Sequence, residues 1–161
     1  MSKDKFIIKK ILNFVLIISN MTRTKINDYK YFQEITTRWN DNDVRWHVNN
    51  AKYYEFFDTI INKYLIDLKS FDLKTDKNFF VTAETSCKYF EEISFPDRIT
   101  AGLKINHIGN SSIKYEIGLF KNENKTVSAI GIFVHILINS ITKRPVKIPV
   151  RIIKHLDALK D

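Results

Sequence analysis

A short stretch between positions 40 and 50 holds most of the side chains that could act on a substrate. It contains two aspartates, one histidine and four asparagines: Asp41, Asp43, His47, Asn40, Asn42, Asn49 and Asn50. From Ala51 onward apolar residues recur at helical spacing, and Asn49 and Asn50 stand where a helix N-cap is expected. The Asp43 carboxylate would then lie one short step before a helix N-terminus, whose free N–H groups can hold an oxyanion. Such a carboxylate can attack a carbonyl carbon or activate water against it. The simpler interpretation is a loop rich in turn-forming residues.

The spacing of these residues resembles a known motif. Asp-x-x-x-His-Val-Asn-Asn-x-x-Tyr, at positions 43 to 53, resembles the N-terminal motif of the 4-hydroxybenzoyl-CoA thioesterase family, the acyl-CoA thioesterases of hotdog fold. Arg-Trp-x-Asp-x-Asp, at positions 38 to 43, is similar to the family pattern as well. Weaker similarities to the family occur at 81–89, 109–112 and 148–151. The resemblance covers nearly the whole chain after about residue 30.

The resemblance implies a reaction, the hydrolysis of an acyl-CoA to free acid and CoA without a cofactor. It implies that Asp43 is the catalytic carboxylate, acting as general base or as nucleophile. It also implies that the backbone N–H of Asn50 polarises the thioester carbonyl. His47 and Asn49 belong to the motif and are expected to shape the loop, with His47 as a packed, hydrogen-bonded residue rather than a proton carrier. Asp41 is expected to be structural and to fix the loop through backbone N–H groups.

Trp46 departs from the family pattern, because many members carry glycine directly before the histidine; Arg45 is a second departure. Glycine would permit a positive φ or a close approach of substrate, and tryptophan permits neither easily. Because an indole exposed in a loop is uncommon, we expect Trp46 to line or cap the acyl site. The two serines of the 109–112 turn would contact the CoA moiety, or simply form the turn. The expected substrate-binding residues are therefore His47, Asn49, Trp46, Tyr54, Ser111 and Ser112.

One strand, one long helix and four further strands must position these residues. Tyr31–Trp39 is rich in β-formers and predicts the first strand. Apolar spacing predicts a helix from Ala51 to about Leu68, buried on several sides. Alternating apolar residues and turn signals predict four more strands and a short C-terminal helix, at 79–90, 98–107, 112–120, 126–139 and 150–159. Gly131, inside the last of these strands, indicates a bulge or close packing.

An antiparallel sheet with a single apolar helix must wrap around that helix to bury it. The expected class is therefore α+β, a hotdog fold with an antiparallel sheet of about five strands around one long helix. Such a layer leaves sheet edges and a flank of the helix uncovered. We therefore expect a homo-oligomer, a dimer or a dimer of dimers.

Two other functions compete with hydrolysis. Hotdog hydratases of enoyl-CoA resemble a different pattern, Asp-x-Asn with a histidine five positions after the aspartate. Here Asp41 is followed at that spacing by Trp46, so this pattern fails. The second alternative is a catalytically inactive hotdog module that binds acyl-CoA or a partner protein, with Trp46 blocking the site.

Charge and cysteine content restrict the partners and the compartment. The net charge of +8 is uneven, since residues 1–30 carry +5 and the remaining residues only +3. A mildly basic body argues against a nucleic-acid surface but suits the phosphates of coenzyme A. The single cysteine, Cys87, excludes a disulfide within the chain and indicates a reducing, cytoplasmic setting. Cys87 is expected to be a buried structural thiol, and no Cys/His cluster has zinc spacing, so we expect no metal.

Residues 1–29 form a basic, apolar extension before a single domain at 30–161. Lys9 and Lys10 precede a short apolar run from Ile11 to Ile18. This run is too short to span a bilayer and lacks a signal-peptidase site. We interpret it as a non-native extension with the true start at Met21; a basic helix lying on a membrane is the alternative.

Overall fold

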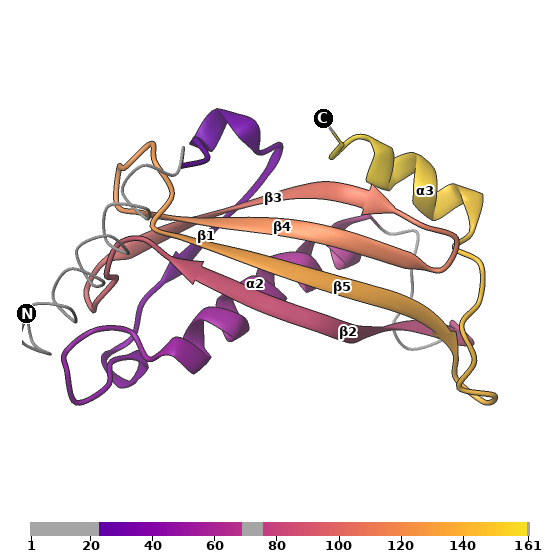
Figure 1. Cartoon of the computed structure of the whole chain (residues 1–161), viewed down its shortest axis with the longest axis horizontal. Helices are drawn as coiled ribbons and strands as arrows, with labels where there is room; N and C mark the ends of the chain where they lie inside the picture. Colours follow the sequence, from indigo (N-terminus) through magenta and orange to yellow (C-terminus); the bar gives the residue numbers. More distant parts are fainter. Residues whose placement is uncertain (1–22, 69–75, 161) are drawn as a thin grey trace, which may run out of the picture.

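The computed structural model describes residues 23–68 and 76–160 (Figure 1). Within these residues the strands form one antiparallel five-stranded sheet, in the order β1-β3-β4-β5-β2. The strands are β1 Tyr31–Thr36, β2 Asn78–Tyr89, β3 Arg98–Ile108, β4 Ser112–Lys121 and β5 Ala129–Asn139. The helices are α2 Asn50–Asp67 and α3 Val150–Asp157, and the short 3-10 helices η1 and η2 span Ile26–Asp28 and Trp39–Asp41. No helix in the described segments is both long and apolar enough to cross a bilayer.

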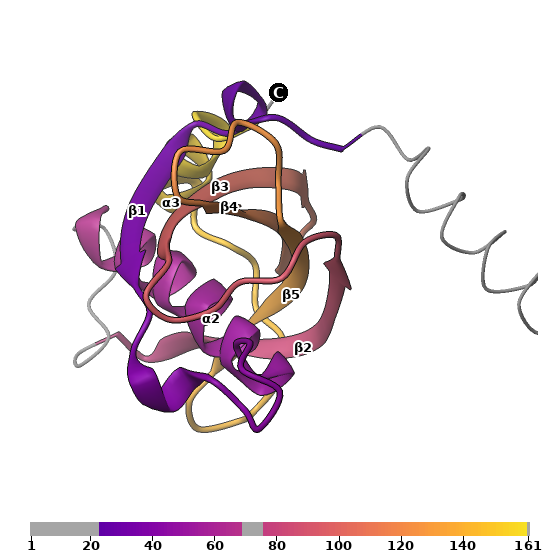
Figure 2. The ribbon, with the colours of Figure 1, turned by 90° about the vertical axis from the view of Figure 1, so that its left-hand side faces the viewer.

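Helix α2 packs in the hollow of the sheet, and the strands curve around it (Figure 2). Buried residues recur every three or four positions along the helix and form one broad apolar face: Tyr53, Phe56, Phe57, Ile60, Ile61, Tyr64 and Leu65. Buried pairs of β3 and β4 residues share one face of the sheet: Ala101 with Leu119, Leu103 with Ile117, and Ile105 with Tyr115. The expected hotdog architecture is confirmed. The helix is buried on this one face only, since Glu55, Asp58 and Ile66 are exposed.

Gly131 allows α2 to lie close to β5. A Cβ atom at Gly131 would be 2.6 Å from Cδ2 of Phe57, closer than packed atoms allow. Of the two possibilities that the sequence left open for Gly131, close packing is therefore confirmed. The irregularity in the β2–β5 ladder lies elsewhere, between Thr82 and Glu84.

The predicted C-terminal boundary of the first strand is wrong. β1 ends at Thr36 rather than at Trp39, which belongs to η2. The cause is Asp41, whose Oδ2 accepts a 2.7 Å hydrogen bond from the Arg38 N–H and so closes a helical turn. A pattern of β-forming residues does not reveal this competing side-chain contact.

The predicted start of the last strand is also wrong, because β5 begins at Ala129 rather than at Thr126. Thr126 instead forms an isolated bridge with Lys25. The Val127 N–H donates to the Thr24 carbonyl at 3.2 Å. Residues 126 and 127 are thus paired with the N-terminal segment, and pairing with β4 begins at Ser128, whose N–H donates to the Leu119 carbonyl at 2.7 Å.

Tyr29 fills a slot on the face of the sheet opposite α2. Gly102 and Gly118 face each other across β3 and β4. A Cβ on Gly102 would lie 2.8 Å from the Tyr29 ring, and one on Gly118 would lie 2.6 Å from it. The ring is 4 % exposed, and its hydroxyl donates to Glu116 at 3.0 Å. Tyr29, which the sequence assigned to the extension, therefore packs against the sheet. The apolar run at 11–18 and the expected start at residue 21 lie outside the described residues.

Candidate active site

Residues 42–48 form a tight hairpin directly before α2, closed by an antiparallel bridge. Inside it, the Asp43 N–H donates to the His47 carbonyl at 2.9 Å. The Trp46 N–H donates to the Asp43 carbonyl at 3.1 Å. The side chain of Asp43 closes the turn as well, because its Oδ1 accepts a 2.7 Å hydrogen bond from the Arg45 N–H. Asp43 is thus held through backbone and side chain, and its second carboxylate oxygen remains available.

Trp46 adopts a left-handed backbone conformation, with φ at 68°. Short hairpin loops often end in a residue of this conformation, and glycine is preferred there. Trp46 thus takes the positive φ that the sequence indicated to be unfavourable for tryptophan. The backbone at Trp46 has the conformation that the glycine of the family pattern permits at low cost.

Asp41 and Asn49 join the hairpin to α2. Asp41 is fully buried and pairs with the Arg38 guanidinium at 3.2 Å, in addition to capping the Arg38 N–H. Its carbonyl accepts a 2.8 Å hydrogen bond from the Asn49 N–H. Asn49 is the N-cap of α2, since its Oδ1 accepts from the Ala51 N–H at 3.0 Å. The predicted structural role of Asp41 and the predicted position of the N-cap are confirmed.

Asn50 is the first residue of α2, and its N–H is available to a ligand. The next two N–H groups are engaged with Asn49: that of Ala51 with its side chain, and that of Lys52 with its carbonyl at 2.9 Å. For the Asn50 N–H, in contrast, no acceptor is found among residues 23–68 and 76–160. A free N–H at the positive end of a helix is a donor for an anionic oxygen.

A cavity of about 440 Å³ brings Asp43, His47 and Asn50 together. Asp43 Oδ2 lies 3.7 Å from His47 Nδ1, and the two side chains are 24 % and 31 % exposed, respectively. The cavity thus presents a carboxylate oxygen and a free helix N–H, which is what attack on a carbonyl requires. The other residues that line it are Arg45, Val48, Tyr53, Tyr89, Phe90, Glu91 and Glu92. Nowhere in the described part of the chain do three His, Cys, Asp or Glu side chains gather into a metal site.

Two tyrosines form an aromatic wall of this cavity. Tyr53 of α2 is almost fully buried and meets Tyr89 of β2 edge to face, with ring centroids 4.9 Å apart. Burial raises the pKa of Tyr53 to about 12, so the wall carries no charge at neutral pH. Cys87 is half-buried on the same strand, and burial raises the pKa of its thiol to about 11. A protonated thiol of this kind supports the structural role expected for Cys87.

The segment 91–97 is hydrogen-bonded to both ends of the hairpin 42–48. The Val48 N–H donates to the Ile93 carbonyl at 2.7 Å. The Phe95 N–H donates to Oδ1 of Asn42 at 3.1 Å. Both ends of the hairpin are therefore fixed to a single segment that also supplies two residues of the cavity lining.

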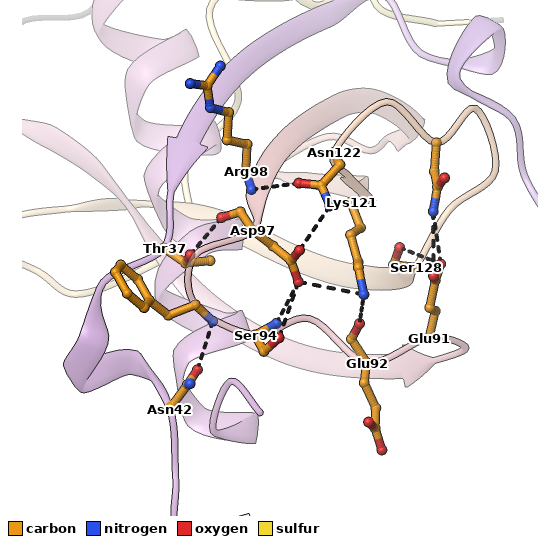
Figure 3. A network of polar contacts seen from close by, with 12 residues as sticks. Thr37, Asn42, Glu91, Glu92, Ser94, Asp97, Arg98, Lys121, Asn122 and Ser128 are labelled. Atoms are coloured by element: carbon orange, nitrogen blue, oxygen red, sulfur yellow. Dashed lines mark hydrogen bonds and ion pairs between the residues drawn. The ribbon is translucent and has the colours of Figure 1, made fainter. Parts of the chain in front are cut away.

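Asp97 fixes the segment 91–97 in turn (Figure 3). Its Oδ2 accepts from the Ser94 N–H at 2.9 Å, and its Oδ1 accepts from the Asn122 amide at 2.9 Å. The Lys121 ammonium lies 3.6 Å from Oδ2 and donates to the Glu92 carbonyl at 3.0 Å. Burial acts to raise the pKa of Asp97, but the hydrogen bonds from Ser94 and Asn122 and the charge of Lys121 lower it below its usual value. One ionised carboxylate thus ties β4 to the cavity wall.

A second cavity, of about 810 Å³, adjoins the first at Asp43 and Arg45. Trp39 and Trp46 line it, with their ring centroids 5.6 Å apart in an edge-to-face contact. They are 65 % and 67 % exposed. The sequence led us to expect that Trp46 would not be exposed and would line or cap the acyl site. The indole is instead exposed, and it lines this second cavity and not the 440 Å³ cavity. The second cavity is completed by Asn42, Val44 and Asn49.

The remaining predicted substrate-binding residues lie apart from both cavities. Tyr54 is half-buried in the core, with its ring 6.1 Å from that of Phe57 and 6.2 Å from that of Phe133. Ser111 lies in the turn from β3 to β4 and Ser112 is the first residue of β4, at the opposite end of the sheet from the segment that precedes α2 (Figure 1). Within one chain, the structure does not bring these serines to Asp43.

Sequence reasoning missed Tyr53, Tyr89, Glu91 and Glu92, which line the cavity. Tyr53 had a signal, because it closes the Asp-to-Tyr motif at positions 43 to 53. The other three had none. These three residues reach the cavity because β2 runs back along α2, so that the C-terminal end of β2 lies near the start of the helix.

A family model described as the thioesterase-like superfamily matches residues 37–158. Among solved structures, the PA5185 protein from Pseudomonas aeruginosa is 41% identical, with a TM-score of 0.82 over 86% of this chain and 97% of that chain. A predicted thioesterase from Bacillus stearothermophilus is 23% identical, with a TM-score of 0.72 over 81% and 96% of the two chains. A thioesterase from Thermus thermophilus, complexed with coenzyme A and Zn, is 23% identical, with a TM-score of 0.71 over 82% and 95%. No curated protein matches the chain. Because the family match spans well over half of the sequence, the chain belongs to the thioesterase-like superfamily.

Proposed function

We propose that this protein hydrolyses the thioester of an acyl-CoA to free acid and CoA, with Asp43 as the catalytic carboxylate. The observation that carries the proposal is that Asp43 and the unpaired N–H of Asn50 border the same 440 Å³ cavity. Membership of the thioesterase-like superfamily supports thioester hydrolysis. The resemblance of positions 43 to 53 to the 4-hydroxybenzoyl-CoA thioesterase motif supports the two residue roles. Coenzyme A in the Thermus thermophilus neighbour supports CoA as the thiol.

Two routes are compatible with this geometry. In the first, Asp43 takes a proton from water as the water oxygen attacks the thioester carbon. The C–S bond then breaks, and the leaving CoA thiolate takes that proton from Asp43. In the second, Asp43 attacks the carbon itself, CoA leaves, and water hydrolyses the resulting mixed anhydride. In both, the Asn50 N–H holds the negative charge that develops on the carbonyl oxygen. A single turnover in ¹⁸O-water identifies the second route when water attacks the anhydride at the aspartyl carbon, because only that attack puts labelled oxygen into Asp43; attack at the acyl carbon labels the free acid, as the first route does.

His47 and Asn49 support the reaction by holding the hairpin. Asn49 caps the helix that presents the oxyanion donor, and His47 anchors the Asp43 N–H through its carbonyl. Ser111 and Ser112 reach substrate in this proposal only from a second copy of the chain, since they lie far from Asp43 in their own.

We also propose that the protein is a homo-oligomer, a dimer or a dimer of dimers. β2 is an edge strand of the sheet, and its residues 82–86 are exposed on both faces. A long unpaired edge is a template for another strand, and a second copy supplies one. The single cysteine supports a reducing, cytoplasmic setting for this assembly.

The proposal is tested with purified protein and a panel of acyl-CoAs of different length and aromaticity, following thiol release. Saturable release from at least one of them is the expected result. Tight binding of acyl-CoA without release would support the inactive module instead.

A further inference from the structure

Asp43 and Arg45 line both cavities of the site. A thioester has two arms, the acyl group and the CoA moiety, which leave the carbonyl carbon in different directions. A carboxylate that acts on this carbon must therefore lie between the acyl group and the CoA moiety. This inference rests on the proposed function: if Asp43 is that carboxylate, one of its two neighbouring cavities binds the acyl group and the other binds the CoA moiety.

We infer that the cavity of Trp39 and Trp46 receives the pantetheine arm of coenzyme A. The smaller cavity contains the free Asn50 N–H and the buried Tyr53 ring, so it takes the carbonyl oxygen and the acyl group. The larger cavity, of about 810 Å³, then binds the pantetheine arm. Both volumes lie within the range of roughly 300–1,000 Å³ that is usual for small-molecule sites.

The chemistry of the second cavity fits pantetheine, which alternates methylene and methyl groups with amides. The two indoles offer apolar faces for the methylene and methyl groups. Asn42 and Asn49 border the cavity, and their Oδ1 atoms are occupied by the Phe95 and Ala51 N–H groups. Among the described residues no acceptor is found for either side-chain NH₂ group, so both can donate to the amide carbonyls of the arm.

The apolar side chains of this cavity are held on the surface at a cost. Val44 is almost fully exposed, Trp39 and Trp46 are about two-thirds exposed, and the Phe95 ring lies 6.0 Å from that of Trp39. Contiguous exposed apolar patches of this kind mark binding sites. Trp46 is also held at a positive φ where glycine would be unstrained, and strain of this kind is found where function requires a side chain in place.

A binding measurement tests the inference without turnover. Trp39 and Trp46 are the chain's only two tryptophans, so tryptophan emission, excited selectively over the seven tyrosines, reports on this cavity. The full-length protein is titrated with CoA, with pantetheine and with adenosine 3′,5′-bisphosphate, and binding is followed in parallel by calorimetry. The inference predicts a saturable change in emission with CoA and with pantetheine but not with the bisphosphate. Calorimetric binding of CoA without a change in emission, a response to the bisphosphate alone, or no binding of CoA overturns it.

A kinetic comparison tests the same cavity with substrate. Trp39→Ala is assayed on an acyl-CoA and on the same acyl group as its N-acetylcysteamine thioester, which lacks most of the arm. KM for the acyl-CoA should rise roughly tenfold, while KM for the short thioester changes less than about twofold. Equal effects on both thioesters would show that Trp39 only supports the loop and would overturn the inference. Ile141→Ala removes an exposed apolar side chain outside both cavities and is the matched control.

If the wild-type protein hydrolyses neither thioester, the proposed function fails, whereas the fluorescence titration still decides where CoA binds.

Discussion

Oδ2 of Asp43 lies 3.7 Å from Nδ1 of His47, beyond hydrogen-bonding distance. Oδ1 of the same carboxylate accepts a 2.7 Å hydrogen bond from the Arg45 N–H. One oxygen therefore orients the carboxylate and the other is free to meet water or substrate. The orientation comes from the hairpin backbone and does not depend on the imidazole ring.

The left-handed backbone at Trp46 predicts an unusual order of stabilities. Trp46→Ala loses the ring contact with Trp39 and keeps the strain, whereas Trp46→Gly loses the contact and relieves the strain. The glycine variant should therefore be more stable than the alanine variant by about 1 kcal/mol. Urea unfolding of both measures this difference. An alanine variant as stable as the glycine variant would show that position 46 is unstrained.

Asp97 predicts a contribution to stability that depends on pH. Its pKa is lowered in the folded protein relative to an ordinary value of about 3.9. The charged form therefore stabilises the fold above about pH 4, and this contribution is lost as the pH falls through the lowered pKa. Asp97→Asn should cost about 1–2 kcal/mol at pH 7, and the difference from wild type should shrink below about pH 4. Urea midpoints measured between pH 3 and pH 7 test this; a difference that is constant with pH would contradict it.

The packing of Tyr29 predicts where the N-terminus can be shortened. A chain that starts at Met21 should keep fold and activity, because it retains Tyr29 and the pairing of Thr24 and Lys25 with the chain before β5. A chain that starts at Tyr31 loses the Tyr29 ring from its slot between Gly102 and Gly118, which should cost about 3–5 kcal/mol. Thermal unfolding compares the two, with Tyr29→Phe as the control that keeps the ring. Equal stability of the two shortened chains would contradict the packing role.

The exposed edge of β2 predicts self-association. Light scattering should give at least twice the chain mass of 19.0 kDa. Thr85→Lys adds a charge to the exposed part of the edge and should weaken association, because charged edges resist strand pairing. Thr142→Lys, in the exposed turn after β5, should not weaken it. A monomer mass at every concentration would rule out an oligomer.

The sequence predicted the parts of the site that are contiguous in the chain. Asp43, the Asn49 cap and the start of α2 follow from local spacing, and the structure places them together. It could not predict that Tyr89 and Glu92 complete the cavity, because only the course of β2 brings them there. The same holds for Asp97, whose partners on β4 are distant in sequence.

Trp46 and Tyr29 show a different limit. At Trp46 the hairpin geometry overrides the conformational preference of the residue, and residue type alone does not reveal this. At Tyr29 the signal lies in Gly102 and Gly118, a pair of glycines that become neighbours only once the register of β3 and β4 is known. The packing of Tyr29 on the face of the sheet opposite α2 was therefore not predicted, although the order of the strands and the long helix was.

The role of Asp43 is tested most directly by thiol release from the preferred acyl-CoA with wild type, Asp43→Asn and His47→Gln, each checked for an unchanged unfolding midpoint. Because Asp43 supplies the free carboxylate oxygen and His47 does not hydrogen-bond to it, the two variants should differ sharply. We predict that kcat falls roughly 10²–10⁴-fold in Asp43→Asn and less than about tenfold in His47→Gln. A folded Asp43→Asn protein that keeps most of the wild-type turnover would contradict the assignment of the catalytic carboxylate.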